Sequence, residues 1–150
     1  MNLFLTEDGV LKLGYYGLIT QAECYSIRKM DCEGLRSFAP EVFRGEYEMK
    51  SDVWSLGIVL VELMGITPYS DYDESELPTK SGVDESPYDK RDNDSEDMSS
   101  FIECCFDMEV DDRYNVDELL DVSRMGWGMM NRIHLWRNAK RERRKGCFNW

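Results

Sequence analysis

The sequence has one histidine and five cysteines among its 150 residues, and the cysteines show neither a Cys-x-x-Cys pair nor a Cys/His spacing typical of zinc ligands. An odd number of cysteines cannot all pair within one chain, so we expect reduced thiols rather than a disulfide framework. Apolar runs are also short. The longest, around Ile58–Met64, falls well below the roughly 20 residues that span a membrane, and no signal-peptide pattern opens the chain. These absences predict a soluble, cytoplasmic protein without a transmembrane segment.

Basic residues are scarce as well: eighteen stand against thirty acidic residues, for a net charge of −12, which argues against nucleic acid as a partner. The charge is unevenly spread. Residues 71–97 hold eleven acidic and three basic residues together with proline and glycine, which predicts a mobile acidic loop at 70–98. From residue 131 onward seven basic residues face one acidic residue. We therefore expect one domain over residues 1–125, since a chain of this length supports one core, and a separate basic tail over 126–150.

The first residues predict a β-hairpin. Two apolar runs, Leu3–Leu5 and Val10–Leu13, flank Thr6–Gly9, in which Asp-Gly supplies the residues that a tight turn needs. Residues 14–38 show no sustained helical or strand period and predict a long irregular segment.

The clearest helix is expected over residues 52–64, with Ser51 as its N-cap and Gly65 as the left-handed residue that ends it. Its apolar residues go nearly all the way round, which predicts a helix buried in a bundle. A strand at Ile58–Val61 is the less favoured alternative. Two more helices follow. One is marked by apolar residues at 101–106, and the other begins after Asn115, with Glu118 completing a capping box. The expected fold class is mainly α with a short β-hairpin.

Five segments now add up to a family resemblance. They are Asn-Leu-Phe-Leu at 2–5, the run at 10–18, Ala-Pro-Glu at 39–41, Lys-Ser-Asp-Val-Trp-Ser-Leu-Gly at 50–57, and the run at 112–120. In this order they resemble the large, C-terminal lobe of a eukaryotic protein kinase of the serine/threonine type, over residues 2–122. The resemblance implies an incomplete α+β kinase fold in which the small lobe is absent.

The resemblance also assigns roles to single residues. Asn2 matches the family's metal and ATP position, whereas Tyr15 stands in place of the aspartate that binds magnesium in the Asp-Phe-Gly triplet. Glu41 would pair with Arg113 as a structural staple. Asp52 would brace the catalytic loop, although complementing the N-terminus of its own helix explains it equally well.

The family needs ATP, magnesium, a glycine-rich loop, a small-lobe lysine and a His-Arg-Asp triplet. None of these three motifs occurs in the sequence. A neutral phenol at Tyr15 cannot replace a carboxylate on magnesium. We therefore expect no catalytic residue, no metal site and no bound cofactor. The chain is interpreted as a pseudokinase-like fragment that acts by binding an unknown protein partner. The alternative is a part of an active ATP-dependent serine/threonine kinase whose small lobe and catalytic loop are missing from this chain.

Two further features of the sequence allow more than one interpretation. Thr20, Ser26 and Ser37 lie where activation-segment phosphorylation falls in the family. Arg28 and Arg36 stand nearby to receive a phosphate, but the family's catalytic-loop arginine is absent from the sequence. In the basic tail, Met129, Ile133 and Trp136 share a helical face. Such a segment suits an acidic membrane, a calmodulin-like partner or a nuclear import receptor. It equally suits contact with the chain's own acidic loop, and we favour that contact or simple disorder.

Overall fold

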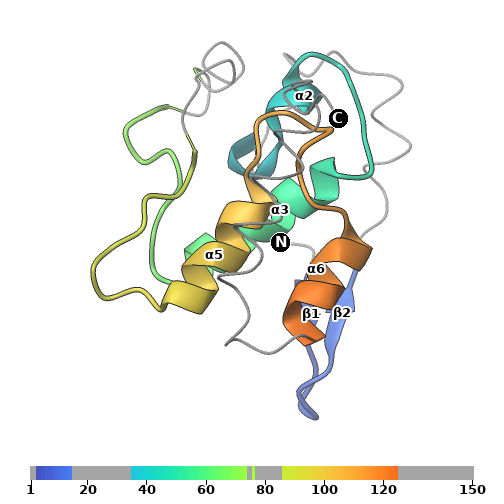
Figure 1. The fold of residues 1–150 in the computed structure, drawn as a ribbon, viewed down its shortest axis with the longest axis vertical. Helices are drawn as coiled ribbons and strands as arrows, with labels where there is room; N and C mark the ends of the chain where they lie inside the picture. Colours follow the sequence, from blue (N-terminus) through green and yellow to red (C-terminus); the bar gives the residue numbers. More distant parts are fainter. Residues whose placement is uncertain (1–2, 15–34, 74–75, 77–85, 125–150) are drawn as a thin grey trace, which may run out of the picture. The chain divides into compact units, whose positions relative to one another are not determined.

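The computed structural model describes residues 3–14, 35–73, 76 and 86–124. It divides into two compact units, residues 1–35 and residues 36–150, and each is described by itself. Figure 1 shows the element order: the hairpin β1–β2, then the helices α2, α3, α5 and α6. The described part of the chain is thus mainly helical with one two-stranded antiparallel sheet, as the sequence predicts.

The first unit contains the predicted hairpin. Strands β1 (Leu3–Leu5) and β2 (Leu11–Leu13) pair antiparallel, with Leu3 opposite Leu13 and Leu5 opposite Leu11. The turn closes where Thr6 N–H donates to the Val10 carbonyl at 2.9 Å, and Gly9 has a φ of +78°, which glycine adopts without strain. Val10 belongs to this turn and not to the strand.

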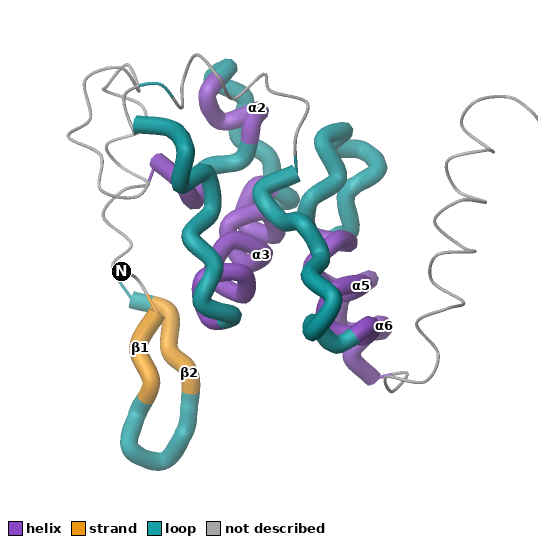
Figure 2. Tube along the Cα trace, turned by 90° about the vertical axis from the view of Figure 1, so that its left-hand side faces the viewer, coloured by secondary structure: helices purple, strands orange, loops and turns teal. Residues whose placement is uncertain are grey.

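Helix α3 (Ser51–Leu63) runs through the second unit (Figure 2). Val53, Trp54, Ile58 and Val61 are buried along it, and Gly65, with a φ of +76°, ends it as predicted. The expectation of burial all round the helix was wrong, because Leu63 is 78% exposed. Apolar side chains cover more of the α3 surface than its neighbours bury.

The predicted N-cap of α3 was also wrong. Lys50 occupies the cap position and Ser51 is already helical. The Ser51 hydroxyl bonds instead outside the helix, donating to Glu41 Oε1 at 2.7 Å and accepting from Glu48 N–H at 3.3 Å. Capping statistics favour serine at this boundary, but a buried carboxylate nearby competes for its hydroxyl.

Helix α5 (Glu96–Cys105) packs against both α3 and α6 (Val116–Arg124). At Gly57 of α3 the contact with α5 is so close that a Cβ would lie 2.7 Å from the Cys105 Cβ. At the start of α6 the predicted capping box is present: Glu118 N–H donates to Asn115 Oδ1, and Asn115 N–H donates to Glu118 Oε2, both at 2.9 Å.

Two short helices precede α3 where no helix was predicted. The 3-10 helix η2 (Leu35–Ser37) ends the segment expected to be irregular, and α2 (Pro40–Phe43) follows it. Proline at the first position suits α2, because its missing N–H would have no partner within the helix. Both elements are too short to give a periodic apolar pattern.

The acidic loop predicted over residues 70–98 overlaps the start of a helix, because α5 begins at Glu96. Pro87 and Tyr88 are buried, and Glu96 and Asp97 form the first turn of α5. Two acidic side chains in the first turn complement the positive end of the helix. No helix in the described ranges is both long and apolar enough to cross a membrane.

Candidate functional site

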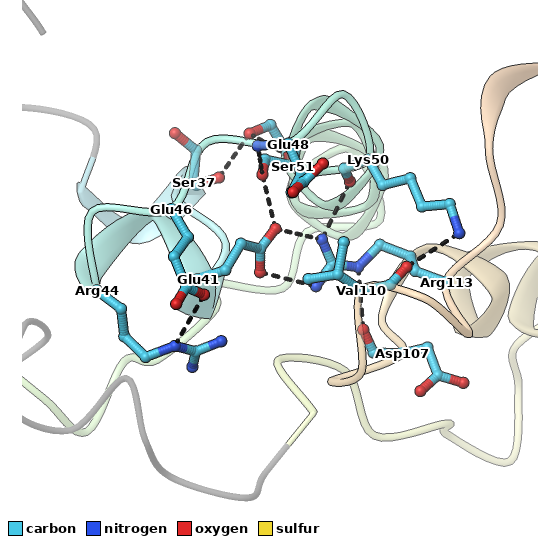
Figure 3. Close-up of polar contacts among 11 residues, drawn as sticks. Ser37, Glu41, Arg44, Glu46, Glu48, Lys50, Ser51, Asp107, Val110 and Arg113 are labelled. Carbon is cyan, nitrogen blue, oxygen red and sulfur yellow. Dashed lines mark hydrogen bonds and ion pairs between the residues drawn. The ribbon is translucent and has the colours of Figure 1, made fainter.

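A buried ion pair joins α2 to the segment that precedes α6. Glu41 lies in α2, and Arg113 lies 72 residues later in the chain. Arg113 Nη1 donates to Glu41 Oε1 at 2.6 Å, and Nη2 donates to Oε2 at 3.0 Å (Figure 3). Both side chains are 0% exposed. Parallel bonds between a planar guanidinium and a carboxylate fix the orientation of both groups as well as their distance.

The rest of the Arg113 guanidinium is also satisfied. Its Nε donates to the Asp107 carbonyl at 3.0 Å, and its Nη1 donates to the Lys50 carbonyl at 3.1 Å. The Cζ atom lies 4.9 Å from the ring centroid of Trp54, which itself packs edge-on against Phe106 at 5.0 Å between centroids. An arginine buried with this many partners is held as a charge and is not a general base or acid. We call Glu41, Arg113, Ser51 and Trp54 the buried brace.

The electrostatics of Glu41 follow from the same contacts. Burial by itself raises the pKa of a carboxyl group, because it disfavours the charged form. Here the hydrogen bonds from Arg113 and Ser51 outweigh burial, and the pKa of Glu41 lies below its ordinary value. The Glu41 carboxylate is therefore ionised at neutral pH.

Lys50, which is half-buried, adds a connection beside the brace. Its Nζ donates to the carbonyls of Val110 and Asp111 at 3.0 and 2.9 Å, so side chain and backbone of one residue both hold the segment before α6 (Figure 3). No sequence signal pointed to the Lys50 and Asp107 carbonyls that accept from Arg113, because backbone carbonyls carry no residue-specific pattern, and the sequence pattern assigned Ser51 to a helix cap.

A second arginine holds the turn that follows α3. Arg36 donates to the carbonyls of Pro68 and Tyr72, at 3.1 and 2.9 Å, and also to that of Tyr69. Tyr69 has a φ of +55°, and burial raises the pKa of its phenol to about 12. A non-glycine residue in this region is strained, and the three bonds from Arg36 offset that strain.

A third polar cluster surrounds Tyr88. Its hydroxyl lies 2.7 Å from Ser99 Oγ and donates to Asp94 Oδ2 at 3.0 Å. Arg91 in turn donates to both carboxylate oxygens of Asp94, and this holds the pKa of Asp94 down at about 2. These hydrogen bonds fix the segment before α5, and the cluster offers no accessible nucleophile.

The structure places the residues singled out from the sequence as follows. It brings Glu41 and Arg113 together. Asp52 is exposed in the first turn of α3, where its charge complements the N-terminus of the helix. Asn2 and Tyr15 lie outside the described residues, as do Thr20 and Ser26. Ser37 is half-buried, and its carbonyl accepts from Ser55 Oγ at 2.7 Å.

Cys104 and Cys105 are buried in α5, and neither forms a disulfide. Burial raises the pKa of Cys105 to about 12, with a further contribution from Cys104, so its thiol is inert at neutral pH. Among the described residues, no group of three or more histidine, cysteine or acidic side chains is placed to hold a metal ion.

Comparison with known proteins extends these observations. The family described as "Protein kinase domain" matches residues 1–124. The chain is 27% identical to serine/threonine-protein kinase Nek9 of Xenopus laevis over 97% of its length, and 32% identical to serine/threonine-protein kinase STE20 of Saccharomyces cerevisiae over 79%. It is 31% identical to serine/threonine-protein kinase cst-1 of Caenorhabditis briggsae over 75%. These matches cover 16%, 13% and 24% of the relatives, so the chain spans a small part of each.

Proposed function

This chain belongs to the protein kinase domain family, and on that premise we propose that it is a piece of the C-terminal lobe which does not transfer phosphate and acts by binding a protein partner. The observation that carries the proposal is Tyr15, at the position that resembles the family's magnesium-binding aspartate. Magnesium takes oxygen ligands, carboxylates above all, and needs near-ideal octahedral geometry.

A tyrosine does not fit this requirement. Its phenol has an ordinary pKa of about 10, so it is neutral at pH 7 and supplies no charge to offset that of a divalent ion. Phosphoryl transfer depends on positioning and on electrostatic stabilisation of the transferred group, in which the metal neutralises developing charge. We therefore derive no chemical step through ATP or magnesium for this chain.

The buried brace supports the second part of the proposal, that the chain acts by binding a protein partner. A bidentate ion pair that is 0% exposed on both sides, with every guanidinium nitrogen bonded, positions α2 and α3 against the segment before α6. These residues hold a scaffold and touch no reacting group. A chain that keeps the scaffold while departing at the metal position suits a binding role.

The test uses the whole chain. We expect ATP with magnesium to leave the melting temperature unchanged, and we expect no transfer of radiolabelled phosphate from ATP to a general peptide substrate. Tyr15→Phe serves as the matched control, since it removes the hydroxyl and keeps the ring, and it should behave like the unaltered chain. A magnesium-dependent rise of several degrees, or phosphate transfer that Asn2→Ala abolishes, would refute the proposal.

A second candidate function rests on the relatives. The named matches are serine/threonine-protein kinases, and the chain corresponds to 13–24% of their lengths. This favours a chain that is one part of a longer, active kinase acting on protein serine or threonine. Reading the nucleotide sequence upstream distinguishes the two: an in-frame glycine-rich loop, lysine and His-Arg-Asp triplet would support the second candidate.

A further inference from the structure

Helix α6 presents an outer face that combines apolar and acidic side chains. Its inner face is closed, since Leu119 and Val122 are buried. On the outer face Val116 is 58% exposed and Leu120 44% exposed. These two residues are four positions apart and so lie on one stripe of the helix, flanked by the exposed Asp117 and Asp121. The described structure leaves both of these apolar side chains uncovered.

The acidic character of this face continues before the helix. Residues 109–121 contain six acidic residues and one basic residue, Arg113, and the charge of Arg113 is buried against Glu41. Two bases lie nearby: Arg124, which is 3.8 Å from Asp121, and Lys50, whose Nζ donates to the carbonyls of Val110 and Asp111. Residues 109–121 thus carry an excess of acidic residues beside an apolar stripe.

We propose that the outer face of α6 is the docking site for residues 129–145 of the chain's own basic tail. The tail lies outside the described residues, so its part is inferred from its sequence. Seven basic residues and one acidic residue stand between positions 131 and 145, which complements the charge of residues 109–121. Met129, Ile133 and Trp136 fall on one stripe if the segment is helical.

The connection between the two segments is short. Only residues 125–128 separate the end of α6 from the tail, and Gly126 and Gly128 allow the sharp turn that an antiparallel helix pair needs. A short tether makes docking an intramolecular event at a high effective concentration. This favours α6 over a surface on another molecule.

The register of such a hairpin matches both kinds of contact. In an antiparallel pair, each step forward on one helix faces a step back on the other. With the turn at 125–128, Ile133 comes opposite Leu120 and Trp136 opposite Val116. In the same register Arg132 faces Asp121 and Arg137 faces Asp117. The apolar side chains of the two segments thus face each other, and each of the two flanking arginines faces an aspartate.

Hydrogen exchange of the full chain, read by mass spectrometry after peptic digestion, tests the proposal. At low salt the amides of residues 129–145 should exchange roughly two- to thirtyfold more slowly in the unaltered chain than in the double variant Asp117→Lys/Asp121→Lys, because two exposed ion pairs are lost. Adding Arg132→Glu and Arg137→Glu to this variant should restore the protection. Restoration separates docking from any effect of the lysines on α6 itself, and unchanged exchange in α3 reports that the fold is intact.

Matched control variants show whether the tail docks on a surface other than α6. Asp89→Lys/Asp92→Lys makes the same charge change in the acidic loop, and Leu63→Ser matches Leu120→Ser on an exposed leucine of α3. We expect both controls to leave the tail protected and Leu120→Ser to weaken its protection. Without any variant, a zero-length carbodiimide reagent should link Lys140 or Lys145 to carboxyl groups of residues 109–121.

Four outcomes would overturn the proposal. The first is that residues 129–145 show no protection from exchange at low salt, and the second is that the acidic-loop variant removes their protection while the α6 variant does not. The third is protection that rises with protein concentration, which would report binding to a second copy. The fourth is protection that appears only when anionic vesicles are added.

Discussion

Replacing Arg113 by methionine removes the charge at the centre of the buried brace and keeps a side chain of similar length. Arg113 makes four hydrogen bonds, two to the Glu41 carboxylate and one each to the carbonyls of Asp107 and Lys50, and it lies over the Trp54 ring. The variant leaves the Glu41 carboxylate buried, with only the Ser51 hydroxyl as a side-chain partner. The cost is therefore mainly that of an uncompensated buried charge.

The magnitude follows from that cost. Breaking a buried pair from one side typically lowers the free energy of unfolding by about 3–5 kcal/mol. For a domain of this size about 1 kcal/mol corresponds to 2–4 °C in melting temperature, so we expect a loss of roughly 6–20 °C. The whole stability of a domain is about 5–15 kcal/mol, so Arg113→Met should remove from about a fifth of it to all of it.

Urea unfolding followed by far-ultraviolet circular dichroism measures the effect, with Arg44→Met as the matched control. Arg44 pairs with Glu46 at 3.4 Å, but these side chains are 54% and 63% exposed. Such a surface pair contributes about 0–1 kcal/mol. The double variant Glu41→Leu/Arg113→Met should be more stable than the sum of the two single changes implies, because it removes both charges. A loss in Arg113→Met no larger than in Arg44→Met would refute the reasoning.

Three more outcomes are expected from the same measurement. Folding lowers the pKa of Glu41, so the contribution of this carboxylate to the free energy of unfolding is present above the unfolded pKa of about 4.3 and is lost as the pH falls below it. Glu41→Gln should flatten this dependence of stability on pH, and an equal slope of stability against pH in both chains would contradict it. Gly57→Ala adds a Cβ 2.7 Å from that of Cys105, so overpacking of about 1–3 kcal/mol should exceed the helix-propensity gain of about 1 kcal/mol; a net increase in stability would show the contact to be looser. Asn115→Ala should cost about 1 kcal/mol through the lost capping box, with the exposed Asn93→Ala as control, and equal effects would count against the cap.

Local sequence rules predicted those features whose causes are local. The hairpin at residues 3–13, the left-handed Gly65 and the Asn115 capping box depend on neighbouring residues, and all three are present. The α2 helix was missed because four residues give no periodic signal. Where a local rule was wrong, as at Ser51, a distant partner competed for the same hydroxyl.

Burial was harder to predict than secondary structure. The apolar patterns of α3 and α6 are correct as helix signals, yet Leu63 and Leu120 are exposed while the charged Glu41 and Arg113 are fully buried. Burial depends on which elements meet, and those contacts join residues far apart in the chain. For the brace, only the family resemblance predicted a contact between distant residues. It predicted the pairing of the two charged residues, but not the contacts that Lys50, Trp54 and the surrounding carbonyls make with them.

The brace and the proposed function can therefore be separated by experiment. Arg113 contacts Glu41, Asp107, Lys50 and Trp54, and all of these act on the fold. If the chain acts by binding a partner, Arg113→Met should lower binding in proportion to the fraction of unfolded chain, since the binding surface is unchanged in molecules that fold. Lowering the temperature to refold the variant should then restore binding at the unaltered affinity per folded molecule. A reduced affinity of the folded fraction would instead place the brace within the binding surface itself.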